Sequence, residues 1–308
     1  TNPTHEETVR VLAAKSGQAN IESLSWVRNE LSEGKLRFNK FYRQCQEADT
    51  YYNGEFDFDT PQGGTMLRLG TFRSVVKTGV DHVAPSFMDV TVPPRSPRSS
   101  AAAERAEKFL LGANHMSEMN QPTKREVVKH QFLYGVGWKK IEFSGTQWAD
   151  FPVPPEAGDE EAYRDQIEDL LAERDFSFPF SAEAVNPQEM VWDLSDSYNP
   201  KWVIRFYKVR AEWIRAHFPD WEKKRGTISG YVPFYEVWTK DSVCYVADNV
   251  WAMQPRKHSY GRIPYIQYWS QTGITTVGRK PENLYQGIGH GNYGMISAQS
   301  QLASNFID

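Results

Sequence analysis

Residues 132–143, Phe-Leu-Tyr-Gly-Val-Gly-Trp-Lys-Lys-Ile-Glu-Phe, mark the point at which the sequence changes from helical periodicity to strand alternation. Before the glycines, apolar residues recur every three or four positions, whereas after them apolar and polar residues alternate. The pair Gly135 and Gly137 indicates a close backbone approach at the start of a strand. The sequence therefore predicts an α+β fold in which helices precede a β-rich region.

The region before this stretch, residues 21–134, is predicted to be helical. Apolar residues at helical spacing, interrupted at Gly34, indicate one long or two short amphipathic helices that end near Tyr52-Asn53-Gly54. These apolar residues are Leu24, Val27, Leu31, Phe38, Phe41, Cys45 and Tyr52. Further helices are expected at 73–88, 99–111 and 121–134, and we expect the last two to pair in an antiparallel arrangement.

Residues 135–270 are predicted to be β-rich. An acidic segment within this region, residues 159–174, has apolar residues on one helical face and proline-rich flanks, so we expect an inserted surface helix there. A short helix is expected at 210–218. Runs of apolar and aromatic residues bounded by turn residues indicate strands at 135–143, 189–193, 202–207, 232–239, 242–247 and 264–269.

The last segment, residues 281–308, is predicted to form one helix that begins at Pro281. Its glycines each cost roughly 1 kcal/mol of helix propensity relative to alanine, so we expect neighbouring helices to support it. The amphipathic pattern runs to Asp308 without a capping glycine or a proline, and we expect the natural polypeptide to continue. The residues predicted to pack this helix against its neighbours are Leu284, Ile288, Gly291, Met295, Ala298, Leu302 and Phe306.

The composition limits the classes of function. The 308 residues carry a formal net charge of −4, which argues against a protein that grips nucleic acid along its whole surface. Cys45 and Cys244 lie far apart and lack the spacing of a metal site. There is no apolar run of about 18 residues, and the polar arm at residues 1–20 has no signal-peptide core. We therefore expect no membrane span and synthesis in a cytoplasm.

Sequence motifs give little support to an enzyme. Nucleotide-binding glycine loops and paired metal-binding histidines are absent from the sequence. Two carboxylate pairs, Asp57 with Asp59 and Asp193 with Asp196, fall in turn-forming sequences where short polar side chains bond their own backbone. We therefore predict no catalytic residue, no metal ligand and no cofactor.

The order of several segments resembles the portal proteins of tailed bacteriophages, most closely those of short-tailed phages, from about Leu36 to the C-terminus. Each segment alone has low specificity, and their order carries the resemblance. The segments are residues 48–54 (ADTYYNG), 75–93 ending in Val-Pro-Pro, 132–140 (FLYGVGWKK), 185–193 (VNPQEMVWD), 236–238 (EVW), 262–265 (RIPY) and 282–288 (ENLYQGI).

This resemblance implies a portal wing domain at residues 21–270 and a truncated first stem helix at 281–308. It implies a non-enzymatic subunit of a ring of twelve copies, located in the virion at the head-tail vertex and synthesised in the host cytoplasm. Double-stranded viral DNA would pass through the ring during packaging, retention and ejection. The implied partners are the major capsid protein, a tail adaptor and, transiently, the packaging terminase.

Polar and basic residues of the last segment are the candidates for contact with DNA, because a channel that lets DNA slide requires weak, sequence-independent contacts. These candidates are Arg279, Lys280, Gln299, Gln301, Ser304 and Asn305.

Two other functions remain open from the sequence. A carbohydrate-binding module of a virion would use exposed tryptophans, for which Trp192, Trp202, Trp238 and Trp251 are available. A metal-dependent hydrolase would use Asp193 and Asp196, although the sequence does not identify a third ligand.

Overall fold

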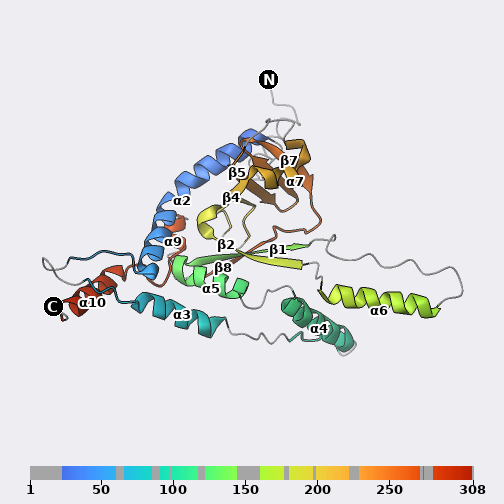
Figure 1. The fold of residues 1–308 in the computed structure, drawn as a ribbon, viewed down its shortest axis with the longest axis horizontal. Coiled ribbons are helices and arrows are strands. Elements are labelled where there is room, and N and C mark those ends of the chain that lie inside the picture. Colours follow the sequence, from blue (N-terminus) through green and yellow to red (C-terminus); the bar gives the residue numbers. More distant parts are fainter. Residues whose placement is uncertain are drawn as a thin grey trace, which may run out of the picture.

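The chain forms two antiparallel sheets, one of three strands and one of five, with helices around them (Figure 1). This arrangement confirms the predicted α+β class. The predicted arm at 1–20 and Arg279 lie outside the described residues. The computed structural model describes residues 23–59, 66–84, 91–96, 99–116, 122–143, 160–176, 180–196, 199–221, 229–270, 273 and 280–306.

The three-stranded sheet has the order β2-β1-β8, with β1 (Val136–Phe143) between β2 (Phe180–Val185) and β8 (Tyr265–Trp269). Gly135 and Gly137 permit the close approach that the sequence predicts. A Cβ atom on Gly137 would lie 2.3 Å from the Val127 carbonyl oxygen, and one on Gly135 would lie 2.3 Å from the Gln286 nitrogen.

The five-stranded sheet has the order β3-β4-β5-β6-β7. Two strands were not predicted from the sequence. Strand β7 contains Pro255, which is tolerated because β7 is an edge strand, and β2 contains two alanines of low strand propensity. The strands are β3 (Met190–Trp192), β4 (Trp202–Arg210), β5 (Tyr231–Thr239), β6 (Ser242–Ala247) and β7 (Val250–Lys257).

The longest helix, α2 (Leu24–Asn53), is a single helix that runs along one side of the molecule (Figure 1). The Ser23 side chain caps its first turn, and Gly54 ends it in the left-handed conformation with φ of 73°. Gly34 does not interrupt the helix. It lies against Val191 of β3, where an added Cβ would be 3.0 Å from the valine Cβ. Gly34 therefore lets the helix pack closely on the five-stranded sheet.

Helix α5 (Pro122–Tyr134) covers β1, and α3 (Thr71–Val83) packs against α5. Gly79 of α3 leaves room for the ring of Phe132, and Arg125 of α5 forms an ion pair with Asp81 of α3. The prediction that α5 pairs with the helix at 99–111 is therefore wrong. That helix, α4 (Ser100–Met116), makes no extensive contact with α5.

The predicted single helix at 281–308 is broken into two, which corrects the expectation of a long stem helix. The described part consists of α9 (Pro281–Leu284), a non-helical segment and α10 (Tyr293–Asn305). The break follows from contacts that a regular helix could not make. The Ile288 N–H donates to the Phe132 carbonyl (2.9 Å), and Gly287 lies so close to α5 that a Cβ would be 1.9 Å from the Leu133 oxygen.

None of the described helices is both long and apolar enough to cross a membrane. The inserted acidic helix is present as α6 (Glu160–Phe176), close to its predicted bounds, between β1 and β2 in sequence. The other short helix, α7 (Ala211–His217), packs against β4.

Candidate functional site

Serine hydroxyls help to attach helix α10 to the rest of the chain. Ser300 and Ser304 are fully buried. Their side-chain oxygens accept hydrogen bonds from the backbone N–H groups of Leu69 (3.2 Å) and Leu67 (2.8 Å). A third serine, Ser297, lies 3.0 Å from the Tyr51 hydroxyl. The inner face of α10 therefore combines these hydroxyls with two apolar side chains, Tyr293 and Ile296, which pack against the core.

The outer face of α10 is apolar. Met295 is 61% exposed, Leu302 is 59% exposed and Phe306, which caps the helix, is 88% exposed. Because these residues follow one another at intervals of seven and four positions, they lie on one side of the helix, together with Ala298. An ordinary surface helix turns its apolar side toward the core, whereas α10 carries large apolar side chains on its outer side as well.

The segment before α10 holds the helix at a defined place. Tyr285 is buried, and its hydroxyl accepts hydrogen bonds from Trp192 Nε1 (3.1 Å) and Gln267 Nε2 (3.0 Å). At the start of α10, the ring of Tyr293 stacks on Tyr51 with centroids 4.4 Å apart. These contacts connect α10 to the core through both β8 and α2.

The predicted packing residues therefore fall into two groups. Leu284 is buried within the chain and Ile288 is half-buried, whereas Met295, Ala298 and Leu302 face outward. Phe306 also faces outward, and Gly291 is an exposed turn residue with φ of 80°.

The candidates for contact with DNA also differ in their exposure to solvent. Lys280, Gln299 and Asn305 are exposed. Gln301 is half-buried and donates a hydrogen bond to the Asp59 carbonyl (2.8 Å). Ser304 has no exposed surface, and its hydroxyl is engaged within the chain, which removes it from the candidates.

Sequence reasoning missed the docking role of Ser297, Ser300 and Ser304. A signal was present, since three serines at intervals of three and four positions form a small polar stripe on one side of a helix.

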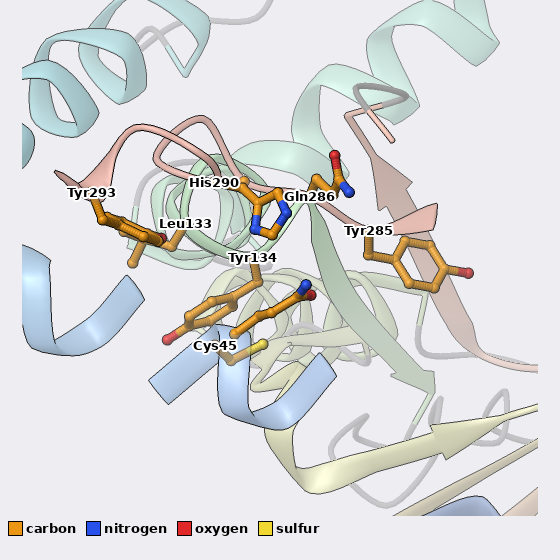
Figure 2. A pocket seen from close by; sticks show the side chains of 9 residues that line it. Cys45, Leu133, Tyr134, Tyr285, Gln286, His290 and Tyr293 are labelled. Carbon is orange, nitrogen blue, oxygen red and sulfur yellow. The ribbon is translucent and has the colours of Figure 1, made fainter. Parts of the chain in front are cut away.

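A small pocket lies where α2, α5 and the segment before α10 meet (Figure 2). Its cavity volume of about 10 Å³ is about what one water molecule requires and is far below the roughly 300 Å³ of typical small-molecule sites. Burial raises the pKa of the Cys45 thiol well above its ordinary value, so this side chain is not a thiolate nucleophile. The pocket is lined by Gln44, Cys45, Leu133, Tyr134, Tyr285, Gln286, Gly287, His290 and Tyr293.

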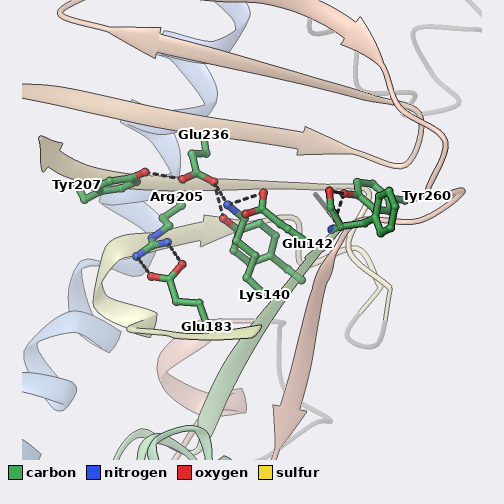
Figure 3. Close-up of polar contacts among 9 residues, drawn as sticks. Lys140, Glu142, Glu183, Arg205, Tyr207, Glu236 and Tyr260 are labelled. Carbon is green, nitrogen blue, oxygen red and sulfur yellow. Dashed lines mark hydrogen bonds and ion pairs between the residues drawn. The ribbon is translucent and has the colours of Figure 1, made fainter. Parts of the chain in front are cut away.

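The two sheets are joined by a buried cluster of charged and phenolic side chains, called here the sheet joint (Figure 3). Glu236 of β5 accepts hydrogen bonds from Lys140 Nζ of β1 (2.7 Å), the Tyr207 hydroxyl of β4 (2.5 Å) and the Tyr265 hydroxyl of β8 (3.0 Å). A second link pairs Arg205 of β4 with Glu183 of β2 through two hydrogen bonds of 2.9 and 2.7 Å.

The sheet joint shifts the pKa values of its charged members. Burial alone would raise the pKa of Glu236, but the charge and hydrogen bond of Lys140 outweigh burial and lower it. Burial alone would lower the pKa of Lys140, but Glu236 and Glu142 outweigh burial and raise it. Both groups are therefore ionised at neutral pH, and every charge in the pair is compensated.

The residues of the two alternative functions occupy structural positions. Trp192, Trp202 and Trp238 are buried in the core, and Trp251 is partly buried against it. Asp193 accepts hydrogen bonds from the backbone of Ser195 (3.0 Å) and Lys201 (3.3 Å), as expected for a turn. Among the described residues, no group of three histidine, cysteine or carboxylate side chains is placed to hold a metal ion.

No protein-family model matches this sequence, and no curated protein matches it.

Proposed function

We propose that this chain is a structural subunit that assembles through the outer face of α10 into a ring around double-stranded DNA, as in the portal proteins that its sequence resembles. The observation that carries the proposal is the exposed apolar outer side of α10. Its serine face is bound to the chain, whereas Met295, Leu302 and Phe306 are exposed to solvent. Contiguous exposed apolar surface on a folded chain typically marks an interaction site.

The size of this surface is consistent with a contact between copies. Burying three large apolar side chains on each copy would contribute roughly 1.5–3 kcal/mol per side chain. Met66 and Leu67 are also partly exposed, and Leu67 is hydrogen-bonded to Ser304, so further exposed apolar side chains lie in the segment bound to α10. The exposed Lys280 and Gln299 would supply the weak contacts expected of a DNA conduit.

The test is the mass and symmetry of the full-length protein, measured by native mass spectrometry and negative-stain class averages. We expect a ring of about a dozen subunits around an open channel, the number implied by the resemblance. The Met295→Asp/Leu302→Asp variant should remain folded and lose the ring, because two charges would have to be buried in the contact.

Phe109→Asp is the matched control, because Phe109 on α4 is 59% exposed, as is Leu302, and lies outside the proposed contact. The control should keep the ring. A wild-type protein that stays monomeric at every concentration would contradict the proposal. Equal loss of assembly in the control would show that the effect is not specific to α10.

A further inference from the structure

The inserted helix α6 stands apart from the rest of the molecule (Figure 1). It lies between β1 and β2 in sequence and packs extensively against no other described helix or strand. Its sequence contains seven acidic and two basic residues, a net charge of −5. None of its acidic side chains between 160 and 169 forms an ion pair with a described residue.

Helix α6 is also amphipathic. Tyr163 and Ile167 lie one turn apart on one side and are half-buried, whereas the acidic residues around them are exposed. An acidic helix with an apolar side suits a protein surface that combines cationic and apolar side chains. DNA is not a suitable partner, because its phosphates would be repelled by a net charge of −5.

The middle of the outer side of α2 has the complementary character, because the exposed Arg37, Lys40 and Arg43 lie there, between Glu33 and Glu47 toward its ends. Leu36, Lys40 and Arg43 follow one another at intervals of four and three positions, so they lie on one face, and all three are exposed. Leu36 is 75% exposed, which is unusual for a leucine in the middle of a long helix. Neither Lys40 nor Arg43, nor the adjacent Arg37, forms an ion pair within the described residues.

The two surfaces lie on opposite sides of the molecule (Figure 1). Helix α2 runs along the left side, whereas α6 extends from the right, so α6 cannot reach α2 of its own chain in this arrangement. Complementary surfaces on opposite sides of one chain are the requirement for a head-to-tail contact between identical copies. Such contacts form a ring when the rotation between copies closes and an open filament when it does not.

We propose that α6 of one copy docks on the outer face of α2 of the next copy, with its acidic residues facing Lys40 and Arg43 and its apolar side facing Leu36. This inference rests on the proposed ring, because only a cyclic assembly would pair every α6 with an α2. It adds a second contact between copies that is electrostatic and separate from the apolar contact at α10. Such a contact would guide subunits into register and weaken with increasing salt.

The test uses charge reversal and charge exchange in the full-length protein, with assembly followed by mass photometry over a range of concentrations. Glu168→Lys/Asp169→Lys on α6 and Lys40→Glu/Arg43→Glu on α2 should each raise the concentration for half-assembly by about tenfold, and the combination should restore assembly to near the wild-type value. Arg105→Glu/Lys108→Glu, the same charge change on exposed residues of α4, is the control and should have little effect.

Three results would overturn the inference. Unchanged assembly in both the α6 and the α2 charge-reversal variants would show that these helices do not contact each other. If the Met295→Asp/Leu302→Asp variant still lost the ring, the proposed function would stand without this contact. Weakened assembly that the combination does not restore would assign α6 or α2 to a different partner. A wild-type protein that never assembles would remove both the proposed function and this inference.

Discussion

The sheet joint and helix α10 both depart from the usual placement of polar and apolar side chains, but in opposite ways. The joint buries charges, and its central carboxylate, Glu236, has hydrogen-bond partners from three strands. Helix α10 exposes apolar side chains, and nothing in the described chain covers them. The first region is complete within one chain. In the proposed ring, a surface of another copy would cover the second, and assembly would remove this difference.

The largest expected effect comes from breaking the joint at Glu236. Glu236→Gln should lower the free energy of unfolding by about 3–5 kcal/mol, because Lys140 would be left buried with only the half-exposed Glu142 to compensate its charge. The measurement is urea-induced unfolding of the subunit followed by tryptophan fluorescence.

An apolar replacement of both partners is the control for this loss. Lys140→Met/Glu236→Leu combined with Tyr207→Phe/Tyr265→Phe removes the buried charges together with the two hydroxyls that donate to Glu236, and should recover much of the stability that Glu236→Gln loses. A loss below about 1 kcal/mol in Glu236→Gln would mean that the joint contributes little and that the sheets are held together by apolar packing alone.

The joint also predicts how stability depends on pH. The pKa of Glu236 is lowered from its ordinary 4.5, so its contribution is present above pH 4.5 and is lost as the pH falls through the lowered value. The pKa of Lys140 is raised from 10.5, so its contribution is present below pH 10.5 and is lost as the pH rises through the raised value. Urea unfolding between pH 2 and pH 7 should therefore show the wild-type protein losing more stability in acid than Glu236→Gln does. Parallel curves for the two proteins would contradict this assignment.

A smaller effect is expected where α5 meets the segment before α10. Gly287→Ala should cost about 1–3 kcal/mol, because the added methyl group would meet the Leu133 carbonyl. Gly294, inside α10, has open space around its Cβ position, so Gly294→Ala should gain up to about 1 kcal/mol of helix propensity. Thermal unfolding of both variants distinguishes the two glycines. A similar gain in both would mean that Gly287 does not make the close approach.

These two glycines also show where sequence reasoning succeeded and failed. Local patterns correctly predicted α2 with its end at Gly54, the strand that begins after Gly135, and the inserted helix α6. The same periodic reasoning failed at 285–292. The spacing from Leu284 to Ile288 is compatible with a helix, and only contact with Phe132 and Leu133, about 150 residues earlier in the chain, selects the broken form.

The candidate site was predicted only in part, for a similar reason. The periodic residues Met295 and Leu302 do share one side of a helix, but their exposure in the single chain depends on which side of α10 meets the rest of the protein. Hydrogen bonds from the backbone N–H groups of Leu67 and Leu69 to the hydroxyls of Ser304 and Ser300 help to fix this orientation of α10. The periodicity of α10 alone could not predict that the segment with Leu67 and Leu69 packs beside it.

The attachment of α10 through its serines should be measurable directly. Ser300→Ala leaves the partly buried N–H of Leu69 without its acceptor and should cost about 1 kcal/mol, with faster hydrogen exchange at Leu69. Ser300→Thr, which retains the hydroxyl, should lose less if the extra methyl group fits. Unchanged exchange at Leu69 in Ser300→Ala would mean that this hydrogen bond does not hold the helix.

The smallest effect on the subunit itself is expected on the outer face of α10. Leu302→Gln should change the free energy of unfolding of the isolated subunit by no more than about 0.5 kcal/mol, because the side chain is already in solvent. The same variant should nevertheless weaken assembly, since its apolar surface would be lost from the contact between copies. Truncation of a buried leucine instead lowers the free energy of unfolding by about 2–5 kcal/mol. A loss of that size in Leu302→Gln would therefore show that the apolar side of α10 packs against its own chain. Stability and assembly, both measured for this one substitution, thus distinguish a helix whose apolar side packs within its own chain from one whose apolar side packs against another copy.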